Sequence, residues 1–348
     1  MNRQELFYEL PEKLIAQVPT NPRDHSRLFV YDRKNKDVEH KHFYDIVSYF
    51  NPGDVLVLND TKVFPARLFG KKETSGGIEI LLLNELSKDS WEVLARGNKK
   101  VATKVIFGKG FYGVFSEKLT NGTWIMRFNK AGTALRKAVD SFGEMPLPPY
   151  ITSKKGVARY QTVYAEQRGS VAAPTAGLHF TKALLTKLTK NGVRVVYLTL
   201  HVGYGTFKPI KDEEVEHHKI HEEFCTVPLS VVKEIRQAKK RGARVVAVGT
   251  TTTRALESAA RAASKKEIIT PYSGATDLYI LPGYTFKVVG ALITNFHLPF
   301  STLLLLVGAF IDQGKGKKAG VATIKKLYQE AIRKKYRFYS FGDAMFIE

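Results

Sequence analysis

The sequence predicts an α/β protein, with a layered α/β main domain interrupted by a small all-β, barrel-like domain. Two observations support this prediction. Apolar strands alternate with helical patterns before residue 64 and after residue 146, whereas short strands separated by glycine turns follow one another in between. We therefore expect a main domain of residues 1–64 plus 146–348, and an inserted β domain at residues 65–145.

The first part of the main domain is expected to hold an extended arm with one short helix, followed by two strands and one further helix. Residues 1–27 are polar and contain three prolines, which is typical of an extended arm. A strand is predicted at 28–31, an amphipathic helix at 42–50 and a buried strand at 54–59. An Asn-Pro-Gly turn separates the helix from the second strand.

The inserted segment has the pattern of a small barrel. Turns are expected at Gly76-Gly77, Gly97-Asn98 and Asn121-Gly122, and the last pair is a strong hairpin signal. Successive short strands of this kind can close on themselves. The strands are predicted at residues 78–83, 91–95, 105–107, 110–115 and 123–128.

Strands and helices alternate again after residue 150, as in layered α/β folds. One helix is expected to begin after Thr181, a good N-cap residue, and to end at Gly192. Strands are predicted at 193–200, 245–248 and 291–294, and further helices at 230–241, 251–263, 301–311 and 321–333.

Polar side chains follow four of the predicted strands. Ligands of open α/β sheets bind beyond the carboxyl ends of the strands, so we expect these four loops to meet at one edge. The candidates are Asn59, Asp60 and Arg67 after the first strand, His201 and Tyr204 after the second, Thr250, Thr251 and Arg254 after the third, and Asn295, Phe296 and His297 after the fourth.

The stretch from Ser170 to Thr181 is rich in small residues, which allow close approach of the backbone to a ligand or to neighbouring backbone. It includes Thr175 and places His179 and Phe180 just before a helix, where unpaired N–H groups favour anions. The alternative is a tightly packed core turn with one hydrogen-bonded histidine. These twelve residues favour neither reading.

Several candidates have a purely structural alternative. The threonines before Arg254 can seat a carboxylate or phosphate, or they can simply cap the helix. His297, between apolar neighbours, can be a hydrogen-bonded core residue. Asp277 is expected at the start of a strand in an apolar context, where a buried carboxylate needs an arginine or a ligand ammonium.

Histidines also gather between residues 217 and 221, next to two glutamates. Their spacing fits no common zinc pattern, so a solvated helix end is the favoured interpretation. The glycines after His201 lack the third glycine and the helix of a dinucleotide fingerprint. An ordinary glycine turn is therefore as well supported as a ligand loop.

The charge points to a polyanionic partner. The chain has 54 Lys and Arg against 33 Asp and Glu, a net charge of +21 spread over several segments. A folded basic surface that binds RNA or DNA is expected, and the alternative is a set of solvated lysine-rich helix faces.

The cysteine count and the missing motifs narrow the function further. Cys225 is the single cysteine, which excludes an internal disulfide and a CxxC zinc site. No stretch resembles a signal peptide or a membrane span, so a cytoplasmic protein is expected. A P-loop, a GxSxG elbow and a glycine-rich methyltransferase opening are absent from the sequence. NTPase, hydrolase and ordinary methyl-transfer functions are therefore disfavoured.

Six blocks resemble the S-adenosylmethionine:tRNA ribosyltransferase-isomerase family of bacterial queuosine biosynthesis. The resemblance runs from about Glu9 to Ile347 and implies an α/β domain interrupted by a β-barrel. The blocks are GDVLVLNDTKVFPARL at 53–68, YQTVYA at 160–165, VAAPTAGLHFT at 171–181, HVGYGTF at 201–207, ITNFHLP at 293–299 and YRFYSFGDAM at 336–345.

The resemblance implies transfer and isomerisation of the ribosyl group of S-adenosylmethionine onto an aminomethyl-7-deazaguanine (preQ1) at the wobble position of a tRNA anticodon. Adenine and methionine are released and an epoxycyclopentanediol remains. S-adenosylmethionine is then a consumed co-substrate, and no other cofactor and no metal are expected. The expected protein is a cytoplasmic monomer.

This chemistry needs acids and bases, because an amine must be neutral to attack, a proton beside the sulfonium must leave, and adenine leaves better when protonated. The hypothesis gives these roles to Asp60, His179, His201 and His297, in an order that is not fixed. Arg254 and the helix start would hold the methionine carboxylate, and Asp277 the ammonium. The aromatic side chains expected to stack on the bases are Phe180, Tyr204 and Phe296.

The chain departs from the family pattern at several positions. It has Thr252 and Thr253 where Ser-Val is expected before Arg254, and Arg168 in place of a proline. Gly290 and Phe300, which replace charged residues, are expected to border the polar edge. Two other functions remain open: a non-catalytic basic RNA-binding protein, and a different α/β enzyme that acts on a nucleotide or sugar phosphate.

Overall fold

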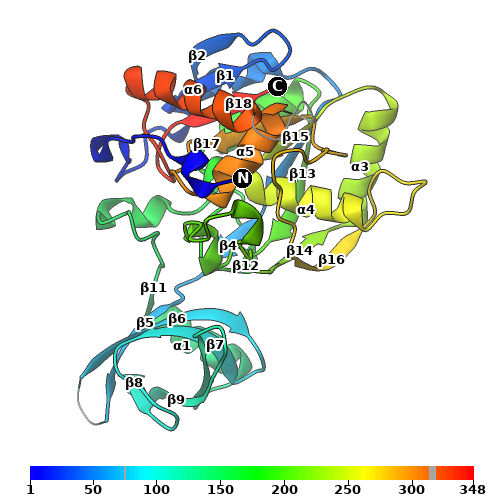
Figure 1. The fold of residues 1–348 in the computed structure, drawn as a ribbon. Helices are drawn as coiled ribbons and strands as arrows, with labels where there is room; N and C mark the ends of the chain where they lie inside the picture. The colour runs from blue at the N-terminus through cyan, green and yellow to red at the C-terminus, as the bar shows by residue number, and fades with distance from the viewer. Residues whose placement is uncertain (74–75, 313–318) are drawn as a thin grey trace. The chain divides into compact units, whose positions relative to one another are not determined.

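The computed structural model describes residues 1–73, 76–312 and 319–348. The chain divides into two compact units (Figure 1). The first consists of Met1–Lys62, Pro149–Gln167 and Ala173–Glu348, and the second of Val63–Pro148 and Arg168–Ala172. The sequence-based division did not include the short return of Arg168–Ala172 to the second unit.

The first unit is built on a mixed sheet. Within the described residues it has nine strands in the order β16-β14-β13-β3-β15-β17-β18-β1-β2. These strands are β16 (Tyr272–Thr276), β14 (Glu223–Val227), β13 (Arg194–Leu200), β3 (Val55–Asn59), β15 (Val245–Val248), β17 (Ala291–Asn295), β18 (Ala344–Ile347), β1 (Arg27–Tyr31) and β2 (Val38–His42).

The centre of this sheet is parallel. β13, β3, β15 and β17 are neighbours in that order and run in one direction, and β3, β15 and β17 are buried along their whole length, as strands covered on both faces must be. The carboxyl ends of the four strands therefore share one edge, which confirms the prediction that their polar loops meet. β18 runs antiparallel to β17 and β1 runs parallel to β18, so the segments before these two strands reach the same edge.

The helices of the first unit follow the predicted pattern closely. Thr181 caps α2 by accepting a hydrogen bond from the Leu184 N–H at 3.1 Å. Leu184, Leu185 and Leu188 of this helix are buried in the core. The helices are α2 (Lys182–Lys190), α3 (Leu229–Lys240), α4 (Thr250–Arg261), α5 (Thr302–Asp312) and α6 (Ala319–Arg333).

Several connecting segments form short 3₁₀ helices. The helix predicted at 42–50 is one of them, η4 (Phe43–Tyr49), and the N-terminal arm contains three more. The remaining elements of this kind are η1 (Arg3–Leu6), η2 (Glu12–Leu14), η3 (Arg23–His25), η5 (Lys154–Arg159), η6 (Thr175–His179), η7 (Tyr204–Phe207) and η8 (Val215–His217).

The second unit contains the predicted barrel. Six antiparallel strands, β5-β6-β7-β10-β9-β8, close through pairing of β5 with β8, and β11 adds to β5. The strands are β5 (Arg67–Lys72), β6 (Gly77–Glu85), β7 (Ser90–Arg96), β8 (Lys104–Gly108), β9 (Phe111–Lys118), β10 (Trp124–Phe128) and β11 (Gly143–Glu144). A separate two-stranded sheet pairs β4 (Thr61–Val63) with β12 (Gln167–Ser170).

Besides its strands, this unit contains the helix α1 (Gly132–Phe142), which was not predicted from the sequence. Leu135, Ala138 and Val139 are its buried side chains, and their helical spacing is the signal that identifies it. Strand β5 was also missed by the sequence analysis. Only two of its six residues, Leu68 and Phe69, are apolar and adjacent, which is a weak strand pattern.

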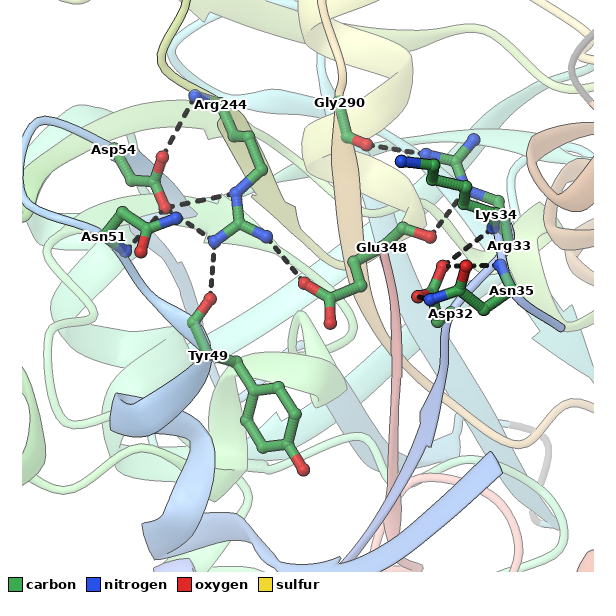
Figure 2. A network of polar contacts seen from close by, with 10 residues as sticks. All are labelled: Asp32, Arg33, Lys34, Asn35, Tyr49, Asn51, Asp54, Arg244, Gly290 and Glu348. Carbon is green, nitrogen blue, oxygen red and sulfur yellow. Dashed lines mark hydrogen bonds and ion pairs between the residues drawn. The ribbon is translucent and has the colours of Figure 1, made fainter. Parts of the chain in front are cut away.

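A network of charged groups ties the sheet together at its amino edge (Figure 2). Arg244, just before β15, donates to the Asp54 carboxylate from its backbone N–H at 3.0 Å and from Nη2 at 2.8 Å. Its Nη1 donates to Glu348 at 2.6 Å. Arg33 in turn donates to the carbonyl of Gly290 at 2.8 Å. Gly290 therefore lies at the edge opposite the polar loops, and the expectation that it borders them is wrong.

Arg244→Met tests this network. Asp54 is only 2% exposed, so removing the guanidinium leaves a buried carboxylate without its charge partner. We expect the free energy of unfolding to fall by about 3 kcal/mol, measured by urea denaturation. Arg241→Met, which changes an exposed arginine at the end of α3, should change it by less than about 0.5 kcal/mol. An equally small effect of Arg244→Met would contradict this account.

Candidate active site

A pocket opens at the carboxyl edge of the parallel strands. Its walls are formed by the start of α4, by the segments that follow β17 and β13, and by part of the stretch from Ser170 to Thr181. Its lining residues are Tyr150, Ala173, Pro174, Thr175, Ala176, Val202, Lys208, Pro209, Gly249, Thr250, Thr251, Thr294, Asn295, Phe296, His297, Leu298, Pro299, Ser301, Leu303, Tyr339 and Ser340. Among these described residues, Lys208 is the one with a full charge at neutral pH, so the pocket is mainly apolar with hydroxyl and amide groups.

The start of α4 forms one wall of the pocket. Gly249 precedes the helix with φ +89°, a conformation that favours glycine. The hydroxyls of Thr252 and Thr253 donate to the carbonyls of Val248 and Gly249 at 2.6 and 3.1 Å, so these two threonines brace the first turn. Thr250 and Thr251 line the pocket, together with the N-terminal end of the helix, which favours an anionic group.

Asn295 connects the pocket wall to the histidine behind it. Its Oδ1 accepts from Thr175 Oγ1 at 3.1 Å, and its Nδ2 donates to the Tyr339 carbonyl at 3.3 Å. The amide nitrogen therefore faces His179 Nε2 at 3.1 Å, which must accept, so the ring proton is on Nδ1 and points to Ser26 Oγ at 2.7 Å. Burial, with smaller effects of Arg337 and Arg23, lowers the pKa of His179 to about 3.

His179 is thus a neutral histidine behind the wall, and it is not among the residues that line the pocket. Both of its ring nitrogens have partners, as in the structural alternative for this stretch. Its contact with Asn295 makes it a support for the site.

His297 lines the pocket itself. Its Nε2 lies 2.9 Å from Thr294 Oγ1, and its backbone N–H donates to the Tyr328 hydroxyl at 3.1 Å. The Tyr8 hydroxyl donates to its carbonyl, so both sides of the peptide are fixed. Burial lowers the pKa of His297 to about 3, and the imidazole is therefore neutral at physiological pH.

Asp60 and His201 form a second polar group at the same edge. The Thr199 hydroxyl donates to Asp60 at 2.7 Å, and Thr61 Oγ1 lies 2.8 Å from His201 Nδ1. Burial raises the pKa of Asp60 and lowers that of His201. Both shifts have the direction that burial alone produces, because burial disfavours the charged form of each group.

Asn59 links this group to the pocket. Its Oδ1 accepts from the backbone N–H groups of Thr61 and Leu200 at 3.1 and 3.0 Å. Its Nδ2 donates to the Leu200 carbonyl at 2.9 Å and to Thr251 Oγ1 at 3.3 Å. The sequence analysis placed Asn59 at the edge but did not foresee that it joins β3, β13 and α4.

Arg254 does not face the pocket. Its Nη1 pairs with Glu223, its Nε donates to the Leu278 carbonyl at 3.0 Å and its Nη2 to the Thr276 carbonyl at 3.3 Å. The other carboxylate oxygen of Glu223 accepts from the Gly203 N–H at 2.9 Å. The buried ion pair therefore holds the loop after β13 against α4, and the expected contact of Arg254 with a ligand carboxylate has no support.

Two of the three expected stacking rings are already packed. Phe180 is fully buried, with its ring centroid 4.9 Å from that of Phe43. Phe296 is fully buried too, and its ring packs 4.9 Å from that of Phe338. Phe180 is not among the pocket-lining residues, whereas Phe296 lines the pocket with its ring packed against Phe338. Tyr204 in η7 is half-buried, with its ring 5.7 Å from Lys208 Nζ.

Asp277 and Arg67 also differ from expectation. Asp277 follows β16, its side chain is 65% exposed, and it pairs with Arg261 at 3.5 Å. The expectation of a buried carboxylate at the start of a strand is therefore wrong. Arg67 belongs to the barrel unit, where its Nη1 lies 3.4 Å from Glu79.

Four further residues line the pocket that were not candidates from the sequence: Tyr150, Lys208, Tyr339 and Ser340. Tyr339 has φ +74°, which is unusual for a bulky residue, and its ring centroid lies 3.8 Å from that of Tyr150. The Tyr150 hydroxyl contacts Ser340 Oγ. The aromatic block at 336–345 was visible in the sequence, but only the antiparallel course of β18 brings it to this edge.

The structure offers no metal centre in its described part. Across residues 1–73, 76–312 and 319–348, no three His, Cys, Asp or Glu side chains are grouped to hold an ion. His217 and His218 pair with Glu214 and Asp212 at 3.5 and 3.3 Å. Likewise, no helix in these ranges has the length and apolarity needed to cross a membrane.

The fold and the pocket define an α/β protein with a cavity at the carboxyl edge of its sheet, where ligands of such folds bind. A family model described as "Queuosine biosynthesis protein" matches residues 3–347, and the chain belongs to this family. Curated relatives named S-adenosylmethionine:tRNA ribosyltransferase-isomerase are 51% identical in Halothermothrix orenii and 49% in Thermotoga maritima, each over the full length of both chains.

A solved structure is also similar. The crystal structure of S-adenosylmethionine tRNA ribosyltransferase from Thermotoga maritima matches with a TM-score of 0.56 and 39% sequence identity. The match covers 99% of this chain and 100% of that one.

The neutral histidines make stability pH-dependent. Because the pKa of His179 is about 3 in the folded chain against 6.5 for an ordinary histidine, the unfolded chain binds the proton more tightly. The contribution of His179 to the free energy of unfolding is fully present above pH 6.5 and is lost as the pH drops toward 3. Between pH 7 and 5, wild type should lose about 2 kcal/mol more unfolding free energy than His179→Gln.

Urea denaturation at the two pH values measures this difference. His217→Gln is the matched control, because the His217 side chain is 73% exposed. It should retain the wild-type pH dependence. A His179→Gln variant as steep as wild type would show that His179 is not held neutral by burial.

Proposed function

We propose that this chain transfers and isomerises the ribosyl moiety of S-adenosylmethionine onto preQ1 in a tRNA anticodon, releasing adenine and methionine. One observation carries the proposal. Four blocks of the family resemblance, at 171–181, 201–207, 293–299 and 336–345, all supply residues to the same pocket. The membership of the chain in the queuosine biosynthesis family supports the same reaction.

The pocket suggests how S-adenosylmethionine is held. The N–H groups at the start of α4 and the Thr250 hydroxyl would receive the methionine carboxylate. Lys208 would add a positive charge from the opposite loop. This assignment replaces Arg254, whose guanidinium is already paired with Glu223.

Proton transfer would be divided between His297 in the pocket and the group formed by Asp60 and His201. Asp60, whose pKa is raised by burial, is the better candidate to deliver a proton to departing adenine. His201 would keep the attacking amine neutral, and His179 would orient Asn295.

The proposal also covers the cellular context. The net charge of +21 suits a tRNA substrate, since cationic side chains replace the counterions of phosphates. The enzyme would act in the cytoplasm as a monomer, with S-adenosylmethionine as a consumed co-substrate and without a metal.

Adenine release tests the function. Purified protein with preQ1-containing tRNA and S-adenosylmethionine should produce adenine, measured by liquid chromatography. His297→Gln and Asp60→Asn should each lower kcat by about 10²–10⁴-fold, because each removes a proton-transfer group, with tRNA affinity nearly unchanged. Arg261→Gln, at an exposed side chain, is the matched control and should retain full turnover.

Each alternative has its own result. No adenine above background from the wild-type protein would contradict the enzyme function and favour a non-catalytic RNA-binding protein. Turnover of a nucleotide or sugar phosphate without tRNA would favour a different α/β enzyme. A His297→Gln or Asp60→Asn variant with full turnover would remove that residue from the mechanism.

A further inference from the structure

Three arginines from distant parts of the chain meet beside the pocket. Arg159, at the end of η5, donates from Nη2 to the Thr20 carbonyl at 2.8 Å, and Arg337, before β18, donates to the Thr20 hydroxyl. Arg23 in η3 donates to the carbonyls of Gln161 and Leu178 at 2.8 and 3.4 Å. We call Arg23, Arg159 and Arg337 the arginine cluster.

The charge of the arginine cluster is not balanced by nearby carboxylates. In the described part of the chain, Arg23 and Arg159 form no ion pair, and Arg337 Nε lies 3.7 Å from Asp343. That carboxylate already accepts the backbone N–H groups of Arg27 and Arg337 at 3.0 and 2.8 Å. Burial, together with the charge of Arg159, lowers the pKa of Arg23. An anionic ligand would relieve this repulsion.

The nearest acidic side chain in the sequence is engaged elsewhere. Asp24, next to Arg23, accepts a hydrogen bond from the Thr181 hydroxyl at 2.9 Å, at the start of α2. The contacts of Arg23 and Arg159 to the protein are made to backbone carbonyls. These contacts orient the guanidinium groups without neutralising them.

Arg23 of the cluster lines a small cavity that shares Ser340 with the active-site pocket. Thr20, Arg23, Ser26, His179, Ser340 and Gly342 are among its lining residues. Ser340 also lines the active-site pocket. His179 contacts Asn295, which lines that pocket from the other side. An anion held by the cluster would therefore lie one layer of side chains from the reacting groups.

We propose that the arginine cluster binds a backbone phosphate of the tRNA anticodon strand next to the modified nucleotide. This inference rests on the proposed function. Each guanidinium carries a positive charge and N–H donors that can pair with phosphate oxygens. A base that must leave the anticodon stack to enter a pocket needs its flanking phosphates fixed, and phosphate contacts set such register.

The surface around the cluster favours RNA over a small carboxylate. Arg337 is 33% exposed, so a polymer can reach it. His25, in the same 3₁₀ helix as Arg23, packs its ring 5.2 Å from Tyr44, which stacks on His42 at 5.1 Å. Arg23 and His25 belong to one short helix, so an exposed ring that could stack on a base is carried by the same element as one arginine of the cluster.

Binding of a preQ1-containing anticodon stem-loop, followed by fluorescence anisotropy from 50 to 300 mM NaCl, tests the proposal. Arg159→Gln and Arg337→Gln should each weaken binding about tenfold. The slope of log K against log salt should fall by about 0.7–0.9 per lost phosphate contact. The KM for S-adenosylmethionine should stay at the wild-type value. Arg159→Lys keeps the charge and should retain most of the affinity.

Arg241→Gln is the matched control, because it removes one exposed arginine at the opposite edge of the sheet, beside Gly53 and Arg194. It should retain the wild-type affinity and slope. Unchanged RNA affinity and salt slope in both cluster variants, with wild-type melting temperatures, would overturn the proposal. A raised KM for S-adenosylmethionine with unchanged RNA binding would instead assign the cluster to the methionine carboxylate.

A variant that fails to fold is identified by its melting temperature, and Arg159→Lys is then the deciding variant. RNA affinity near the wild-type value supports the proposed phosphate site. A loss of affinity as large as that of the Gln variants overturns it. Adenine release by the wild-type protein is measured alongside. If the wild type releases adenine and the cluster variants bind RNA normally, the phosphate site is wrong and the proposed function stands.

Discussion

The parallel alignment of β13, β3, β15 and β17 is the constraint on which the rest of the first unit depends. Parallel neighbours bring their carboxyl ends to one edge, so four loops that are far apart in the sequence must meet there. The amino edge is held by the network of Asp54, Arg244 and Glu348. The two edges therefore differ, with a network of structural ion pairs at the amino edge and a mainly apolar pocket at the carboxyl edge.

Buried amides organise the pocket. Asn295 holds Thr175, Tyr339 and His179 in one arrangement, and Asn59 does the same for β3, β13 and Thr251. Each amide has both a donor and an acceptor, so one side chain can fix several loops without introducing a charge. Burial keeps His297 in the pocket and His179 behind its wall neutral.

Much of the fold could be predicted from the sequence because its signals are local. The strand at 54–59, the Thr181 cap and the hairpin at Asn121-Gly122 all depend on neighbouring residues. Helix α1 has the same kind of local signal, through Leu135 and Val139. It was not predicted because the sequence around it has the pattern of strands. For the site, the strand-end rule brought Thr250, Asn295 and His297 together correctly.

The wrong predictions have a common physical cause: the side chains concerned contact residues that are far away in the sequence. Arg254 pairs with Glu223 on a strand that precedes it by 31 positions, and no periodicity links the two. Phe180 fills the core against Phe43, although its sequence neighbours looked like a ligand loop. Tyr339 reaches the pocket only because β18 runs antiparallel to β17. Such contacts follow from the tertiary arrangement and could not be read from motifs.

The most direct test of the central claim, that the pocket at the carboxyl edge is the active site, is a crystal structure with S-adenosylmethionine bound. The account predicts the ligand in this pocket, with its carboxylate within hydrogen-bond distance of the Thr250 N–H and its sulfonium facing His297. Binding outside this pocket, or a carboxylate held by Arg254 in place of Glu223, would contradict it.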